Sequence, residues 1–182
     1  MAMTLIADNT ADTTDLANVS FTSGIDSTYK LYIFKFWGIG PATDGTDFTF
    51  NGSIDGGSNY NVVKTTTFYR AWHAEATSAE GVDVEAEDLA QSANAVNLSI
   101  YCGADADESS AGALWLFNPA GTTCIKHFYS TVQMTQGGEG VDSSQNIFTS
   151  GYFNDGDDNI DAVQFKMSSG NFDGTIKMYG VG

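Results

Sequence analysis

Hydrophobic and polar residues alternate with a period of two along much of this chain. The clearest case lies near the C-terminus, where Val163, Phe165 and Met167 are separated by polar residues. A second alternating run follows at 175–178, and a Ser-Ser-Gly-Asn cluster stands between the two runs. Alternation of this kind is typical of strands with one buried face, and the cluster between them predicts the turn of a β-hairpin.

Similar runs, rich in aromatic and β-branched residues, recur between clusters of Gly, Asn, Asp and Ser. They lie at 16–22, 29–37, 46–51, 61–73, 96–102, 113–117, 124–134 and 147–153. With the C-terminal pair they predict about eight to ten strands, and helical patterns are nearly absent. The fold expected is an all-β, antiparallel, jelly-roll-like β-sandwich formed by residues 16–182 as a single domain.

Two segments depart from this pattern. Residues 1–15 are polar after Ile6, and we expect an N-terminal arm that orders only against a neighbour. Residues 77–95 are acidic and rich in Ala and Ser, which is consistent with a long loop or with a short helix beginning near Glu85. We expect an exposed acidic insertion there.

The run at 29–37 is apolar on both of its faces. One face carries Leu31, Ile33 and Trp37, and the other carries Tyr32, Phe34 and Phe36. A loop could cover the second face of such a central strand, or that face could lie in a subunit interface. These six residues are therefore the candidate interface residues, and they predict a homo-oligomer, most simply a trimer.

Charge narrows the choice of partners. The 182 residues carry a formal net charge of -16, and the seven Lys and Arg residues are spread singly along the chain. Phosphate binding requires clustered cations, so we expect no nucleic-acid partner. No apolar run is long enough to span a membrane, and the N-terminus lacks a basic signal-peptide region, so we expect a product that is made in the cytoplasm and remains soluble.

Residues that could support catalysis are scarce. Only His73 and His127 could serve a nucleophilic triad, and no Gly-x-Ser-x-Gly motif occurs. Cys124 precedes His127 by three positions, but side chains at that spacing point to opposite faces of a strand. We therefore predict no enzyme activity, no cofactor and no metal ion. Cys102 and Cys124 are expected to be free and mostly buried thiols.

Carboxylates cluster in two turns, at 105–108 and 155–158. Their simplest interpretation is solvated loop charge. The alternative is a calcium site, for which Asp155, Asp157 and Asp158 are the better set of ligands. A glycan-degrading site built from two such carboxylates ranks far below the non-enzymatic roles considered below.

Three sequence runs resemble a group of virion structural proteins of tailed phages, especially marine phages that infect cyanobacteria. These runs are Phe-Thr-Ser-Gly-Ile-Asp-Ser-Thr-Tyr-Lys at 21–30, Phe-Asn-Gly with Ser-Asn-Tyr at 50–60, and Ser-Gly-Asn-Phe closing on Ile-Lys-Met-Tyr-Gly at 169–180. The resemblance covers the chain from about Leu16 onward. It implies a jelly-roll-like sandwich located in the virion, and it carries no catalytic residue.

From this resemblance we expect a capsid decoration or cement protein that binds other virion proteins such as the major capsid protein. The alternative is a tail-fibre or head-fibre adhesin that binds host surface glycan through exposed aromatic side chains such as Trp37, Trp72 and Trp115.

Overall fold

The computed structural model describes residues 2–10, 12–84, 86–137, 142–154 and 158–182. Within these residues the chain forms twelve β-strands and no helix. The strands are β1 (Met3–Asp8), β2 (Val19–Phe21), β3 (Leu31–Pro41), β4 (Thr46–Ser53), β5 (Lys64–Ala74), β6 (Glu80–Val84), β7 (Val96–Cys102), β8 (Ser110–Phe117), β9 (Lys126–Gln136), β10 (Ser143–Phe153), β11 (Ala162–Met167) and β12 (Phe172–Val181).

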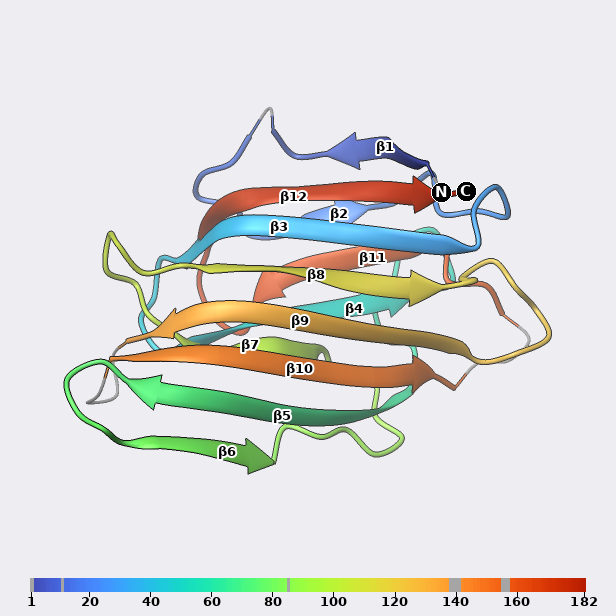
Figure 1. Ribbon diagram of the computed structural model, residues 1–182. Helices are drawn as coiled ribbons and strands as arrows, with labels where there is room; N and C mark the ends of the chain where they lie inside the picture. The colour runs from blue at the N-terminus through green and yellow to red at the C-terminus, as the bar shows by residue number, and fades with distance from the viewer. Residues whose placement is uncertain (1, 11, 85, 138–141, 155–157) are drawn as a thin grey trace.

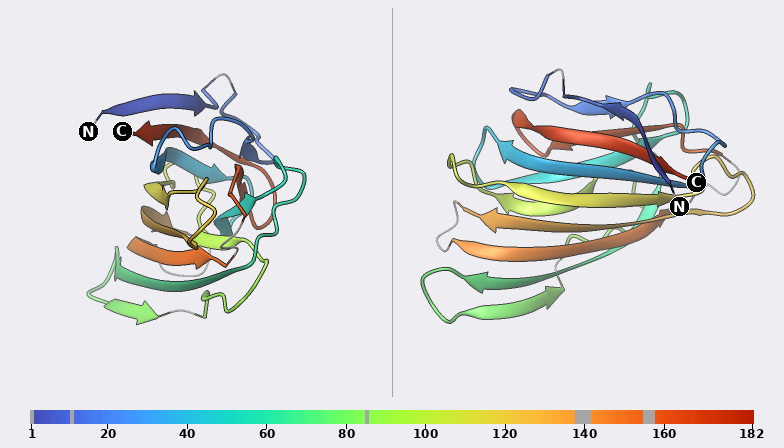
Figure 2. Two further views of the ribbon diagram at one scale, coloured as in Figure 1. Left: turned by 90° about the vertical axis from the view of Figure 1, so that its right-hand side faces the viewer. Right: turned by 45° about the horizontal axis from the view of Figure 1, so that its top comes forward.

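Every strand pairing is antiparallel, and the strands lie in two layers (Figures 1 and 2). The front layer has the order β1-β12-β3-β8-β9-β10-β5-β6, and the back layer has the order β2-β11-β4-β7. The layers are hydrogen-bonded where Cys102 of β7 pairs with Gln136 of β9, so the whole sheet is nearly closed on itself. The predicted all-β, antiparallel class is confirmed.

The predicted number of strands was too low. All ten predicted runs form strands, and β1 and β6 are additional. β1 lies within the predicted arm and pairs with β12 of the same chain, whereas β6 lies within the predicted acidic insertion and pairs with β5. Val82 and Val84 of β6 are 74% and 79% exposed, so this part of the insertion is a solvated edge strand. Residues 86–95 contain no helix, and Glu85 lies outside the described residues.

The predicted C-terminal hairpin is wrong, although its pattern of buried residues is right. Phe165 and Ile176 are fully buried, as the alternation predicted. However, β11 pairs with β4 and β2 in the back layer, while β12 pairs with β3 and β1 in the front layer. The turn between them therefore crosses from one layer to the other, and β11 faces β3 across the core.

Aromatic rings from both layers meet in that core. The Phe165 ring of β11 lies 5.4 Å from Phe34 of β3 and 5.9 Å from Phe48 of β4, measured between ring centroids. Phe50 of the back layer likewise packs edge-on against Phe128 of the front layer, at 5.0 Å. Burial of rings of this size is the main source of stability for a two-layer fold.

No helix among the described residues has the length and hydrophobicity needed to cross a lipid bilayer.

Candidate functional site

The outward face of the front layer differs in charge from the loops around it. The chain has 23 Asp and Glu residues, yet none occurs in β3, β8, β9, β10 or β5. These five strands are neighbours at the centre of the front layer (Figure 1). A broad surface without carboxylates in so acidic a chain is a candidate contact surface, because repulsion from a neighbouring acidic molecule is weakest there.

Four aromatic side chains form a row across this face, one from each of β8, β9, β10 and β5. The rings of Trp115 and Tyr129 are 4.6 Å apart and 15° from parallel. Tyr129 and Phe148 are 5.9 Å apart at 16°, and Phe148 and Tyr69 are 5.2 Å apart at 25°. These distances and angles describe offset stacking, which holds the rings of neighbouring strands in a fixed order. We call these residues the aromatic row.

Strand register places a groove beside the aromatic row. Ser150 of β10 pairs with Tyr129 on one side and with Thr67 on the other. Two positions further along β10, Tyr152 pairs with His127 in the same way. The short side chains of Ser150 and Thr67 therefore lie between rows of larger side chains, and a shallow depression remains above them.

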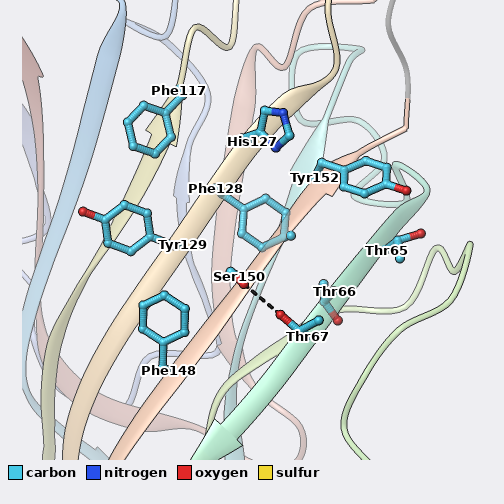
Figure 3. Close-up of a pocket in the computed structure, with 11 residues that line it drawn as sticks. Thr65, Thr66, Thr67, Phe117, His127, Phe128, Tyr129, Phe148, Ser150 and Tyr152 are labelled. Carbon is cyan, nitrogen blue, oxygen red and sulfur yellow. Dashed lines mark hydrogen bonds between the residues drawn. The ribbon is translucent and has the colours of Figure 1, made fainter.

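The groove has a volume of about 440 Å³, within the range of small-ligand sites. Figure 3 shows its lining: Thr65, Thr66 and Thr67 of β5, Phe148, Ser150, Gly151 and Tyr152 of β10, His127, Phe128 and Tyr129 of β9, and Phe117 of β8. Aromatic carbon and hydroxyl groups thus line the same space, without a carboxylate.

The polar groups of the groove keep hydrogen-bonding capacity. The hydroxyl oxygens of Thr67 and Ser150 are 2.8 Å apart and share one hydrogen bond (Figure 3). Two hydroxyls carry two hydrogens, so this pair retains one donor and several acceptor lone pairs. The His127 ring lies edge-on to the Tyr152 ring at 6.1 Å, and His127 is exposed. The groove can therefore both donate and accept hydrogen bonds.

The predicted interface residues are divided between the two faces of β3. Tyr32, Phe34 and Phe36 are buried in the core of their own chain, so they cannot contact another subunit. On the outward face Ile33 is 9% exposed, since it lies between Tyr179 of β12 and Trp115 of β8. The accessible members of the set are Leu31, which is partly buried, and Trp37, which is 45% exposed.

A second group of exposed side chains lies on β1, β12 and β3. Met3 and Leu5 of β1 are 46% and 47% exposed, close to the value for Trp37. The ammonium group of Lys177 lies 5.7 Å from the Trp37 ring centroid and 3.9 Å from a carboxylate oxygen of Asp8. We call Met3, Leu5, Leu31, Trp37 and Lys177 the β1–β12–β3 patch. Its Leu31 pairs with Phe117 of β8, which lines the groove, whereas Trp37 lies six residues further along β3.

The two other tryptophans proposed for glycan contact are less accessible. The Trp72 indole N–H donates a hydrogen bond of 2.6 Å to Asp83, and the residue is partly buried. Trp115 is partly buried in the aromatic row. Neither residue lines the groove.

The proposed metal ligands are not brought together where the structure describes them. Asp155 and Asp157 lie outside the described residues, and Asp158 is exposed. Across the described ranges, no group of three or more His, Cys, Asp or Glu side chains is placed to hold a metal ion. Cys102 is a buried free thiol, as predicted, whereas Cys124 is exposed, which corrects the expectation that both are buried.

Sequence analysis missed Tyr129, Phe148, Ser150 and Tyr152. A signal existed, because alternate positions of 127–131 and of 148–152 carry polar or aromatic residues on the face opposite to the buried one. What places them side by side is the register of β9, β10 and β5, which no local pattern specifies.

No family model, no curated protein and no solved structure matches this chain.

Proposed function

We propose that this chain is a non-enzymatic structural protein of a tailed-phage virion, most simply a decoration protein on the capsid surface. The sequence support is the resemblance of the runs at 21–30, 50–60 and 169–180 to phage virion proteins. The finer assignment of a jelly-roll-like sandwich belongs to the same proposal, and two antiparallel layers packed across one core are in keeping with it.

The observation that carries the proposal is the β1–β12–β3 patch. Met3, Leu5 and Trp37 leave nearly half of their surface in water, in a chain with a net charge of -16. Contact with another protein would remove this apolar surface from water. Full burial of a side chain of this size contributes about 1.5–3 kcal/mol, and roughly half of that remains to be gained at these positions. The partners proposed are sister copies, most simply in a trimer, and the major capsid protein.

Sedimentation of the purified protein tests this proposal, alone and with capsids that lack it, in low and in high salt. We expect a homo-oligomer whose affinity of self-association increases with salt, because screening weakens the repulsion between acidic copies. We also expect binding to the capsids. Trp37→Ser should weaken both self-association and capsid binding. Val82 is also exposed and apolar but lies on the edge strand at the opposite side of the layer, so Val82→Ser should change neither. A strict monomer that does not bind capsids contradicts the proposal.

A second candidate is an adhesin of a tail fibre or head fibre. The groove beside the aromatic row favours it, because this site combines aromatic and hydroxyl groups on a rigid sheet. The patch adjoins the groove at Leu31, but Trp37 lies six residues away along β3, so one molecule could dock through Trp37 and keep the groove free.

A further inference from the structure

We infer that the groove between Phe148 and Tyr152 is a binding site for a neutral carbohydrate. The inference deepens the glycan-binding candidate, and it is independent of whether the chain is carried on a capsid or on a tail. It assigns the site to particular residues and excludes charged sugars.

The lining of the groove matches the chemistry of a pyranose. A sugar ring presents C–H groups on its faces and hydroxyl groups around its edge, so it needs apolar walls and groups that both donate and accept hydrogen bonds. The Phe148 and Tyr129 rings, 5.9 Å apart, supply apolar carbon on one side. The Ser150 and Thr67 hydroxyls supply hydrogen-bonding groups between the walls. A lipid or a purely apolar segment would leave the remaining donor of this pair without a partner, which costs roughly 1–3 kcal/mol.

The opposite side of the groove is formed by Tyr152 and His127. The phenol hydroxyl of Tyr152 can donate or accept, and a neutral imidazole carries one donor and one acceptor nitrogen. The two rings are 6.1 Å apart and lie edge to face, so both are held by contact with each other. Groups fixed in this way lose little conformational entropy when they bind a ligand.

Charge determines which class of carbohydrate fits. The strands that line the groove contain neither Asp nor Glu, and His127 is the only ionisable cation among the lining residues. The molecule as a whole carries a net charge of -16, so its field repels an anion that approaches the groove. Sialylated, sulfated and phosphorylated sugars need cationic partners, which the groove does not offer. A neutral oligosaccharide meets no such barrier.

The test is a titration of the intact protein with neutral glucose-, galactose- and mannose-based oligosaccharides and with sulfated and sialylated counterparts. Binding is followed by saturation-transfer NMR and by isothermal calorimetry. We expect at least one neutral glycan to bind in a saturable way, with contacts from aromatic protons. We expect charged counterparts to bind at least about tenfold more weakly, a difference of about 1.4 kcal/mol.

Two matched variants locate the site. Tyr152→Ala should weaken binding by about tenfold or more, as is common for an aromatic side chain that contacts the bound partner. Tyr179 lies on β12, on the same face of the layer but outside the groove. Tyr179→Ala removes the same kind of side chain and should change the affinity for the glycan by less than about twofold. The NMR contacts in the unaltered protein test the site even if a variant folds poorly.

Three outcomes overturn the inference. The first is the absence of saturable binding of any neutral glycan up to about 10 mM. The second is equal binding of charged and neutral sugars. The third is loss of self-association in Tyr152→Ala with no glycan binding in the unaltered protein, which would assign the groove to a subunit interface. None of these results bears on capsid binding through Trp37, so the two proposals fail separately.

Discussion

Phe165 is the side chain on which the packing of the two layers depends most. It is fully buried, and its ring contacts those of Phe21, Phe34, Phe36, Phe48 and Phe50. The neighbouring Lys166 is exposed and points away from the core. Adjacent residues of β11 therefore have opposite environments, as the alternation of its sequence predicted.

Phe165→Ala should lower the free energy of unfolding by about 3–5 kcal/mol, because it removes a buried ring and leaves a cavity among five others. Lys166→Ala should change it by less than about 0.5 kcal/mol. Urea unfolding of the two variants measures both values. Equal effects would mean that β11 is shifted in register by one residue.

Lys64 is a buried cation with an unusual dependence on pH. Its ammonium group donates a hydrogen bond of 2.6 Å to the Asn94 carbonyl and lies 5.9 Å from the Phe153 ring centroid. Burial lowers the pKa of Lys64 to about 8. The unfolded chain, with a lysine pKa of about 10.4, therefore binds more protons than the folded chain between these two values.

The folded state should accordingly become more stable, with respect to Lys64, as pH rises from about 8 to about 10. Comparison with Lys64→Met isolates this effect, since other groups titrate equally in both proteins. The free energy of unfolding of the wild type, relative to that of Lys64→Met, should rise by roughly 1–3 kcal/mol between pH 7 and pH 10. Lys166→Met, at an exposed position, should show no such shift. A flat difference for Lys64→Met would contradict the burial of a charged ammonium group.

At the scale of elements, β12 contains a bulge where it pairs with β3. The register shifts between Asp173 and Thr175, and Gly174 has a φ of 144°. A Cβ atom at Gly174 would lie 2.5 Å from the Ile39 side chain and 2.9 Å from the Gly38 carbonyl oxygen. Both conformation and space therefore require glycine at this position.

Gly174→Ala should destabilise the fold by about 2 kcal/mol or more, because it combines backbone strain with a steric clash. Gly40→Ala is the matched control on the partner strand, where a Cβ atom would meet only the Glu108 carbonyl oxygen, at 3.7 Å. That control should be neutral or slightly stabilising. Thermal unfolding compares them, and equal melting temperatures would argue against the bulge.

Local patterns predicted most strands but not how they are arranged. Runs such as 61–73 and 124–134 were recognised because buried and polar positions alternate. β6 was missed because its two valines alternate with acidic residues and face water, so no buried face marks it. The prediction that β11 and β12 pair as a hairpin was wrong because each strand buries one face. That alternating pattern is the same whether two strands pair in one layer or lie in opposite layers of a core. The groove depends on register among β9, β10 and β5, which contacts between distant segments determine.

At the scale of the whole molecule, charge is segregated. Carboxylates are absent from the central strands of the front layer and crowd into loops and edge strands, and the four strands of the back layer contain one, Asp47. The front layer therefore offers a broad face on which a second molecule can approach a chain of net charge -16. The same net charge makes the folded state subject to self-repulsion, which salt screens.

Raising NaCl from about 10 mM to about 500 mM, which shortens the Debye length from about 30 Å to a few ångströms, should therefore raise the melting temperature. For a chain of this length each kcal/mol gained corresponds to about 2–4 °C. Calorimetry at low protein concentration separates this effect from association, and an equal osmolarity of a non-ionic solute is the control. A melting temperature that falls with salt would indicate that attractive ion pairs dominate.

The central claim, that this chain is displayed on a capsid as a decoration protein, is tested most directly by its copy number per purified virion. Quantitative mass spectrometry against the major capsid protein gives that number. Decoration of a repeating lattice predicts hundreds of copies in a simple ratio to the capsid protein, since every equivalent lattice point offers the same site. A count of about a dozen would assign the chain to a tail appendage, and its absence from the particle would contradict the virion proposal itself.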